Sequence, residues 1–403
     1  MQAIWFDVSI PKVLATQALG RLWSGAYFSG VSPVRLGVVT PLPLGPGQVR
    51  VRNLLCGICA SDLHIIYSDV DPRVHPAALP GHDRIYLGHE VVSVVEDVGP
   101  AVTRLKVGDR VVMQSRFVRT VCAAQGRPPC PACAEGDYAV CESGTANPLT
   151  PGVGGGFGEG YTAHEAELWA VPDFLTDEQA ALVEPLACSL RAVRRAPPPP
   201  QSKVLVIGCG TIGLGIVMAL RALHPDVQVY AAARHPQQRA LATTNGATLL
   251  AGPLLDETAR ITGATLHKGH FGNRTLTGGF DVVYDSVGQD ETVGTALRCT
   301  RSRGTTMIAG VHLHPSKLDL TPVVHEEVEL KGSFCHGQER WQGDSLSTMD
   351  LVSRLLRTGA IDAQPLLTHR FPLAQWREAL RTASDKNSGC IKVMFDYRAA
   401  PAS

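Results

Sequence analysis

The chain has 403 residues, of which 44% are hydrophobic and 18% charged, so it can bury a sizeable core and is not disordered as a whole. Its 37 Lys and Arg residues balance 37 Asp and Glu residues, and a net charge of zero gives no general attraction to nucleic acid or to an anionic membrane. At about 100–200 residues per domain, the length predicts two domains.

The chain shows no sign of export or membrane insertion. It begins MQAIWFDVSI, without a basic stretch before an apolar one, which argues against a secretory signal. No apolar run reaches the roughly 18 residues of a membrane helix. The 11 cysteines are an odd number in a long chain, so reduced thiols are expected, which are structural, metal-bound or catalytic. We therefore expect a cytoplasmic protein.

The first part of the chain, residues 1 to about 185, consists of short β-rich pieces separated by turns. Residues 48–55 begin with alternating polar and apolar side chains, as in a half-buried strand. Residues 90–98 are rich in Val and end at Gly99-Pro100, and residues 106–112 read as a turn that leads into another strand. This pattern predicts a barrel-like or sandwich-like β domain.

A helix is expected at 176–195, with Thr176 as its N-cap and Asp177 in its first turn, and Pro185 is expected to kink or divide it. From Lys203 onward strands alternate with helices, which predicts a doubly wound α/β unit. The expected strands are 204–207, 227–232, 281–285 and 305–309, and the expected helices are 212–223 and 239–245. A Leu-rich helix at 349–357 precedes a tail at 391–395, which is expected to rejoin the β domain.

The Gly-rich sequence at 208–213 fits the pattern G-x-G-x-x-G, directly after an apolar strand and at the start of a helix. Glycines at Gly208, Gly210 and Gly213 permit a tight turn and a close approach of the backbone to a pyrophosphate. The N–H groups of the helix start, at Thr211 and Ile212, are directed at such a ligand. The alternative is a Gly-rich turn without a ligand, but the strand and helix context favours dinucleotide binding.

The end of the second strand predicts which dinucleotide is bound. An NAD-binding chain usually has Asp or Glu there to bond the ribose 2′-OH, whereas this chain reads Ala232-Ala233-Arg234. The guanidinium of Arg234 suits a 2′-phosphate, and Arg239 is a weaker second candidate. The alternative is a surface arginine with NAD bound less specifically. We expect NADP(H) to be preferred over NAD(H).

Two further motifs combine the ligand types of a zinc site. The first motif contains Cys59, four residues after Leu55 of the expected strand at 48–55. The second contains His89 and Glu90, where the Val-rich strand begins. Cys, His and a carboxylate can form a tetrahedral zinc site with one open position. Cys56 and Cys59 also form a C-x-x-C pair, so a redox pair and two buried thiols are the alternatives. Neither alternative explains the polar residues Ser61, Asp62 and His64 that follow.

Taken together, these motifs resemble the zinc-dependent medium-chain dehydrogenases, near the sorbitol, threonine and glucose dehydrogenase branches, along nearly the whole chain. The matching segments are Gly57 to His64, Gly88-His89-Glu90, Val107 to Val111, Glu184 to Ala187, Thr368 to Leu373 and Gly389 to Val393. The resemblance implies a GroES-like catalytic domain at 1–185 and a Rossmann domain at 186–338, with residues 339–403 returning to the catalytic domain.

The resemblance also implies roles for single residues. Cys59, His89 and Glu184 match the ligands of the catalytic zinc, and Glu90 matches a nearby acid that can approach or replace a ligand. Asp62 matches the carboxylate that orients the ligand histidine. Ser61 and His64 match the relay that carries the alcohol proton to solvent, and Lys392 is expected at the cofactor. Cys56 has no role in the family and is expected to be a packing residue.

Four further cysteines, Cys122, Cys130, Cys133 and Cys141, have the short spacing of a closed tetrahedral zinc site. In the family this lobe, here at about 115–145, carries a structural zinc with the spacing C-x2-C-x2-C-x7-C. The first gap is lengthened here by residues 123–129, so Cys122 is the least certain ligand, and a disulfide pair is the alternative. Together the two sites predict about two zinc ions per chain.

The expected function is hydride transfer between NADP(H) and a small-molecule alcohol, either a secondary alcohol or a polyol or sugar-type compound, in a homodimer or homotetramer. A zinc-free quinone or enoyl reductase and a non-enzymatic NADPH-binding protein are the alternatives, but neither explains an open metal site with a proton relay. Three long segments, 10–35, 65–87 and 263–279, have no assigned role, and His75 and His82 within the second are not assigned to zinc.

Overall fold

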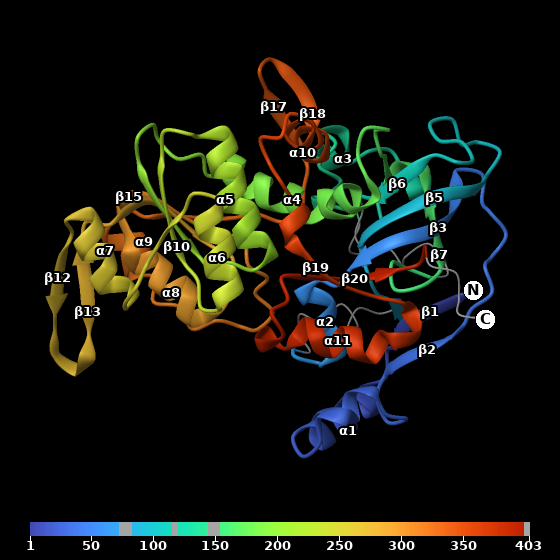
Figure 1. Ribbon diagram of the computed structural model, residues 1–403, viewed down its shortest axis with the longest axis horizontal. Coiled ribbons are helices and arrows are strands. Elements are labelled where there is room, and N and C mark those ends of the chain that lie inside the picture. The colour runs from blue at the N-terminus through green and yellow to red at the C-terminus, as the bar shows by residue number, and fades with distance from the viewer. Residues whose placement is uncertain (72–82, 115–119, 144–153, 399–403) are drawn as a thin grey trace. The chain divides into compact units, whose positions relative to one another are not determined.

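The structure, a computed structural model, describes residues 1–71, 83–114, 120–143 and 154–398. The chain forms two compact units (Figure 1). Unit 1 comprises Met1–Glu184, His336–Met349 and Leu366–Ser403, and unit 2 comprises Pro185–Cys335 and Asp350–Pro365. His75 and His82 lie outside the described residues. Among the described residues, no helix is long and apolar enough to cross a membrane.

Unit 1 is built on a seven-stranded sheet with the order β19-β20-β3-β5-β6-β8, in which β7 also pairs with β3. The strands are β3 (Gln48–Gly57), β5 (Glu90–Val98), β6 (Arg110–Met113), β7 (Gly160–His164), β8 (Leu168–Ala170), β19 (Leu367–Phe371) and β20 (Lys392–Asp396). Alternate residues of β3, such as Val49 and Val51, face a core that also contains Phe395 of the C-terminal strand. The predicted β domain and the predicted return of the C-terminal tail are therefore present.

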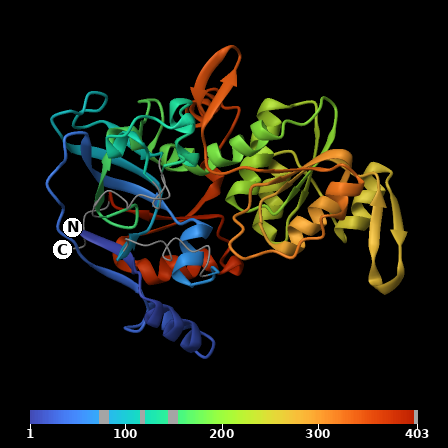
Figure 2. The ribbon, with the colours of Figure 1, turned by 180° about the vertical axis from the view of Figure 1, so that it is seen from behind.

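The segment 10–35, left unassigned from the sequence, contains a helix and part of a second, smaller sheet. This sheet has the order β2-β1-β4, formed by β1 (Gln2–Asp7), β2 (Val34–Val38) and β4 (Arg84–Tyr86). Between β1 and β2 the chain forms α1 (Ile10–Gly20) and a short 3-10 helix, η1 (Ser24–Phe28). Figures 1 and 2 both show α1 extending from the end of this sheet.

Unit 2 contains a fully parallel six-stranded sheet with the order β11-β10-β9-β14-β15-β16. Its strands are β9 (Lys203–Ile207), β10 (Gln228–Ala232), β11 (Thr248–Leu249), β14 (Phe280–Asp285), β15 (Thr300–Ile308) and β16 (Glu329–Gly332). Its helices include α5 (Thr211–Leu223), α6 (Pro236–Thr244), α7 (Leu254–Thr262), α8 (Asp290–Cys299) and α9 (Thr321–His325). The strand order reverses beside β9, which confirms the predicted Rossmann fold.

Pro185 was expected to kink or divide the helix, and it does not divide it, because the structure has one helix, α4 (Asp177–Arg195), with the proline inside. Buried apolar residues on both sides of the proline, such as Leu182 and Leu186, favour continuation of the helix over its interruption. The Ser189 hydroxyl donates to the Pro185 carbonyl at 2.9 Å. The boundary between the two units falls within this helix, after Glu184.

The C-terminal part of the chain differs from the predicted unbroken return at 339–403. Residues 350–365, which include most of α10 (Thr348–Arg357), belong to unit 2. Leu351, Val352, Leu355 and Leu356 are buried. Their spacing gives the helix one buried apolar side. The chain then returns to unit 1 through β19, α11 (Trp376–Ser384) and β20.

Two antiparallel hairpins were not predicted. One accounts for the unassigned segment 263–279 and consists of β12 (Thr265–Lys268) and β13 (Arg274–Thr277), with Phe271 fully exposed at its tip. It extends from unit 2 beside α7 (Figure 1). The other, β17 (Gln338–Trp341) with β18 (Asp344–Ser347), belongs to unit 1, where the Gln338 N–H donates to Asp137 at 2.7 Å.

Candidate active site

The candidate active site of unit 1 is organised by the buried carboxylate of Asp62. This residue lies in the first turn of α2 (Ala60–Ile66), whose N-cap is Cys59. One carboxylate oxygen accepts the Cys59 N–H at 3.1 Å, and the other accepts the Gly88 N–H at 3.1 Å. That second oxygen also lies 3.6 Å from Nδ1 of His89. Asp62 therefore holds together the two chain segments that present Cys59 and His89.

Cys59, His89 and Glu90 form a group in which one ligand atom from each lies within 4.8 Å of the others. Cys59 follows the end of β3, and Glu90 begins β5, its neighbour in the sheet. The predicted grouping of these three residues is thus present in the structure. A thiolate, an imidazole and a carboxylate are the donors that zinc prefers in catalytic sites, so the residues fit a zinc ion.

Lys392 of β20 lies beside Glu90 and is almost completely buried. Its Nζ donates to the two Glu90 carboxylate oxygens at 2.8 and 2.6 Å and to the Ile58 carbonyl at 3.2 Å. A Cβ atom at Gly57 would overlap a Glu90 carboxylate oxygen, so a larger residue there would displace the Glu90 side chain. The sequence suggested Lys392 only as a cofactor residue, and that role stays a prediction. No local pattern could have paired two residues 302 positions apart.

The charges around this group favour a cation. Burial alone would lower the pKa of His89, but the nearby Asp62 and Cys59 raise it well above its ordinary value. Burial likewise acts to lower the pKa of Lys392, and the charges of Glu90, Cys59 and Glu184 outweigh that effect and raise it. Several anionic groups therefore converge on this buried region, which suits the binding of a divalent cation.

Glu184, the third ligand implied by the resemblance, lies on α4 and is 7% exposed. It is not part of the compact group formed by Cys59, His89 and Glu90. Its charge nevertheless contributes to the raised pKa of Lys392, so Glu184 lies near the same buried region. The structure therefore brings Glu90 closer to the other two ligands than Glu184.

The two predicted relay residues lie on α2, three positions apart, so Ser61 and His64 share one side of the helix. The His64 side chain is 34% exposed, and its Nδ1 lies 3.1 Å from Oδ2 of Asp69. Asp69 was not identified from the sequence, because it follows the helix in a segment without a motif. Cys56, which was expected to be a packing residue, is buried in β3 and forms no disulfide, and its thiol donates to the Gly57 carbonyl at 3.5 Å.

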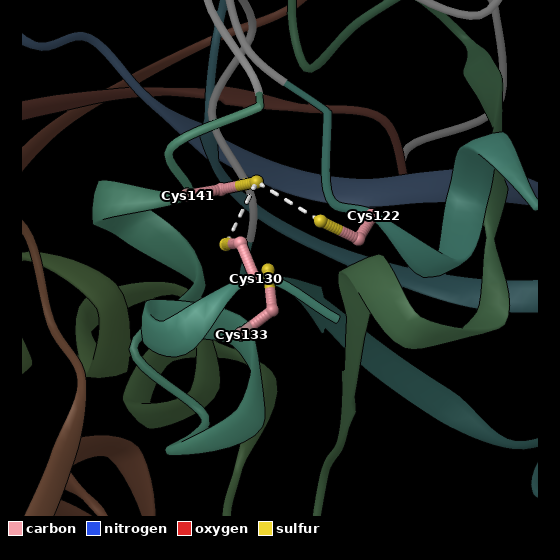
Figure 3. Close-up of side chains that lie close together, drawn as sticks. All are labelled: Cys122, Cys130, Cys133 and Cys141. Atoms are coloured by element: carbon pink, nitrogen blue, oxygen red, sulfur yellow. Dashed lines mark hydrogen bonds between the residues drawn. The ribbon is translucent and has the colours of Figure 1, made fainter. Parts of the chain in front are cut away.

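The four-cysteine lobe brings its thiols together as predicted. Cys122, Cys130, Cys133 and Cys141 have sulfur atoms within 4.8 Å of one another (Figure 3). The Cys141 sulfur lies 3.7 Å from that of Cys122 and 3.9 Å from that of Cys130. Zn–S bonds of about 2.3 Å in a tetrahedron give S···S separations of about 3.8 Å. All four cysteines are free, so the disulfide alternative is not found, and the lengthened first gap still brings Cys122 into the group.

Hydrogen bonding in this lobe favours thiolate formation at one ligand. A hydrogen bond with the Cys133 backbone, which follows Cys130 at the start of α3 (Pro131–Ala134), lowers the pKa of Cys130 to about 6. Burial instead raises the pKa values of Cys133 and Cys141, so only part of this group favours the thiolate form that zinc binds.

In unit 2, the Gly-rich turn joins β9 to α5 and has the geometry expected for pyrophosphate binding. Gly208 has a φ of 85°, and a Cβ at Gly213 would overlap the Gly208 carbonyl. A Cβ at Gly210 would meet no atom within 4 Å, so the space above the turn is open. Gly210 caps α5, whose first residues are Thr211 and Ile212. The first N–H groups of a helix, together with its dipole, favour the binding of phosphate groups.

Strand β10, after which the ribose-binding residue is expected, ends at Ala232 as predicted. Arg234 follows in an exposed position, and the described structure gives it no ion pair. The Arg239 guanidinium donates to the Ala233 carbonyl at 3.2 Å, so it braces this loop from α6. Helix α6 begins at Pro236, three residues before the predicted start, because proline is favoured in the first turn.

Comparisons with known proteins agree with this site. Residues 45–173 match the alcohol dehydrogenase GroES-like domain, and residues 211–350 match the zinc-binding dehydrogenase domain. An L-idonate 5-dehydrogenase of Vitis vinifera is 30% identical over 380 residues, which cover 92% of this chain and 94% of that protein. The chain belongs to the zinc-dependent medium-chain dehydrogenase family.

Solved structures show the same relationship. The 2R,3R-butanediol dehydrogenase of Bacillus subtilis is 27% identical, with a TM-score of 0.69, over 90% of this chain and 96% of that one. A putative zinc-binding dehydrogenase of Sinorhizobium meliloti 1021, bound to NADP, is 26% identical with a TM-score of 0.69, over 90% and 95% of the two chains. The protein is an alcohol or polyol dehydrogenase of the zinc type that uses a nicotinamide cofactor. Membership of this family excludes the two alternatives left open by the sequence, which are a zinc-free quinone or enoyl reductase and a non-enzymatic NADPH-binding protein.

Proposed function

We propose that this enzyme transfers hydride between NADP(H) and a secondary alcohol or a polyol or sugar-type compound. The observation that carries the proposal is the group formed by Cys59, His89 and Glu90, organised by the buried Asp62. The butanediol and idonate dehydrogenases among its relatives support a substrate whose reacting hydroxyl has polar neighbours.

Cys59, His89 and Glu184 are the proposed ligands of the catalytic zinc, and Glu90 is the proposed auxiliary acid. Both Glu90 carboxylate oxygens accept hydrogen bonds from Lys392. This ion pair competes with coordination of a metal by Glu90, which supports Glu184 as the third ligand.

A zinc ion held by these residues would act as a Lewis acid and lower the pKa of the substrate hydroxyl, and a bound nicotinamide would supply the hydride acceptor. Asp62 fixes the positions of Cys59 and His89 through its hydrogen bonds to the backbone. The hydroxyl of Ser61 takes the proton of the substrate, and His64 passes it to solvent, because His64 is partly exposed. Carbonyl reduction uses the same residues in reverse.

The proposed cofactor preference rests on the loop after β10. The strand ends without an acid that could accept the ribose 2′-OH, and the exposed Arg234 offers a guanidinium to a 2′-phosphate. The NADP-bound relative supports this preference. Arg239 supports the loop that presents Arg234 through its bond to the Ala233 carbonyl.

The four-cysteine lobe is the proposed site of a structural zinc, which makes about two zinc ions per chain.

A homodimer or homotetramer is the proposed assembly, and light scattering of the purified protein tests it.

The decisive experiment is a panel of secondary alcohols and polyols, each assayed with NADP⁺ and NAD⁺, together with elemental analysis for zinc. Cys59→Ala should lose one zinc ion and all turnover. The matched control is Cys56→Ala, which removes a buried thiol three residues away and should keep both zinc ions and turnover. The proposal fails if the untreated enzyme holds no zinc, or if Cys56→Ala is as inactive as Cys59→Ala.

A further inference from the structure

The N-terminal segment, residues 10–32, precedes the region that matches the family domains, which begins at residue 45. It nevertheless packs against the far end of α2, the helix that carries Ser61 and His64. The Gln17 side chain on α1 donates from Nε2 to the Ser68 carbonyl at 2.9 Å, just beyond the end of α2. A segment outside the family domains therefore contacts the helix of the proposed relay.

An aromatic cluster strengthens this contact. The Tyr27 and Tyr67 rings meet edge to face with centroids 4.9 Å apart, and Phe28 meets Tyr67 at 6.1 Å. Phe28 also packs against Trp376 of α11 at 5.7 Å, and the Tyr67 hydroxyl lies 3.1 Å from that of Ser384. Tyr67, the C-cap of α2, is thus held between the N-terminal segment and α11.

Ser68 turns the chain back towards His64. It has a φ of 53°, in the left-handed region that residues other than glycine rarely adopt. The Asp69 N–H that follows donates to the His64 carbonyl at 2.8 Å, and the Asp69 carboxylate lies 3.1 Å from His64 Nδ1. The strained turn therefore places a carboxylate on one nitrogen of the relay imidazole, and Gln17 and Tyr67 hold that turn in position.

The contact with Asp69 determines which nitrogen of His64 can accept a proton. A carboxylate accepts hydrogen bonds, so Nδ1 donates its hydrogen to Asp69 in this pair. The other nitrogen, Nε2, is then the acceptor that receives the proton from the relay. Asp69 therefore determines both the tautomer and the orientation of the His64 imidazole ring.

We propose that Asp69 is a positioning residue for His64, and that the N-terminal segment braces the Ser68 turn that places it. This inference rests on the relay of the proposed function, because Asp69 acts only through His64. It gives the N-terminal segment a role in turnover although it contributes no group to the metal site.

The test compares kcat, KM and zinc content of four variants. Asp69→Ala should lower kcat by about tenfold, less than the roughly 10²–10⁴-fold contribution of a general base itself, with zinc retained and KM within about twofold. Asp69→Asn, which keeps an acceptor oxygen, should recover most of that loss. Gln17→Ala should lower kcat by about threefold, in the same sense as Asp69→Ala but less. Leu14→Ala, on the exposed side of the same helix, is the matched control and should leave kcat unchanged.

His64→Ala separates this inference from the relay on which it depends. If Asp69 acts through His64, then His64→Ala with Asp69→Ala should be no slower than His64→Ala alone, and added imidazole should restore both to the same rate. A normal kcat for His64→Ala would refute the relay and the inference with it. A slow His64→Ala beside normal Asp69→Ala and Gln17→Ala, or a loss of zinc from Asp69→Ala, would refute the inference alone.

Discussion

Lys392 and Glu90 form a buried ion pair in which the lysine Nζ lies 2.8 and 2.6 Å from the two carboxylate oxygens. Their side chains are 4% and 2% exposed. The pair connects the C-terminal strand β20 with the start of β5, immediately beside His89. The last strand of unit 1 thus contributes directly to the charge balance around the proposed zinc site.

Removal of one partner of this pair should be costly. Lys392→Met leaves the Glu90 carboxylate buried without its cation, which should lower the free energy of unfolding by about 3–5 kcal/mol. Adding Glu90→Gln should recover a large part of that loss, because the uncompensated charge is gone. Urea unfolding of the two variants measures both effects. Equal stability of the single and double variants would contradict this account of the pair.

The four-cysteine lobe should be a structural metal site. Cys133→Ser should reduce the zinc content from about two ions per chain to about one and lower stability, since a structural zinc contributes to the free energy of folding. The remaining zinc should still support turnover of the folded fraction. Elemental analysis and thermal unfolding check this prediction. Cys390→Ser, a buried thiol outside both metal groups, is the matched control and should keep the full zinc content.

Cofactor choice should depend on the residues after β10. Arg234→Ala should weaken NADP binding by about 1.5–3 kcal/mol, the range of a charge-assisted hydrogen bond, and barely change NAD binding. That range corresponds to roughly tenfold to over a hundredfold in affinity. Ala233→Asp should move the preference towards NAD, because a carboxylate repels the phosphate and accepts the ribose hydroxyl.

Titrations of both cofactors with these two variants measure the preference. Arg260→Ala, which removes an exposed arginine of the same unit, is the control and should change neither affinity. If the unmodified enzyme binds NAD more tightly than NADP, then a residue other than Arg234 binds the adenosine ribose of the cofactor.

An ion-pair network at the start of α4 should make stability depend on pH. Burial acts to raise the pKa values of Glu178 and Asp396, but hydrogen bonds, including those from Arg398, outweigh it and lower both. Because the folded-state pKa values are lowered, the stabilisation is present at neutral pH and is lost as the pH falls through the acidic range below about 5.

Arg398→Ala should therefore cost about 1 kcal/mol at pH 7, and the difference from the unmodified protein should shrink as the pH falls towards 3. Unfolding by urea at several pH values measures this difference. Lys331→Ala, which removes an exposed ion pair with Glu329, is the comparison and should have a smaller effect. A difference that is constant over this pH range would mean that Arg398 stabilises the fold by packing.

The sequence by itself determined the features that depend on neighbouring residues. The turn at Gly208 to Gly213, the end of β10 at Ala232 and the grouping of Cys130, Cys133 and Cys141 follow from local spacing and periodicity, whereas only the structure placed Cys122 in that group across its lengthened gap. Cys59, His89 and Glu90 could each be identified as candidates from a short motif at the end or start of a strand, but the pairing of β3 with β5 and the contacts of Asp62 bring them together.

Only the tertiary structure decided the features that depend on distant residues. The pairing of Lys392 with Glu90, and that of Gln17 with Ser68, joins segments that share no sequence pattern. Burial of apolar residues on both sides of Pro185 kept α4 continuous, although proline by itself disfavours a helix interior. Such contacts are set by which surfaces the folded chain brings together, and local propensity contains no information about that choice.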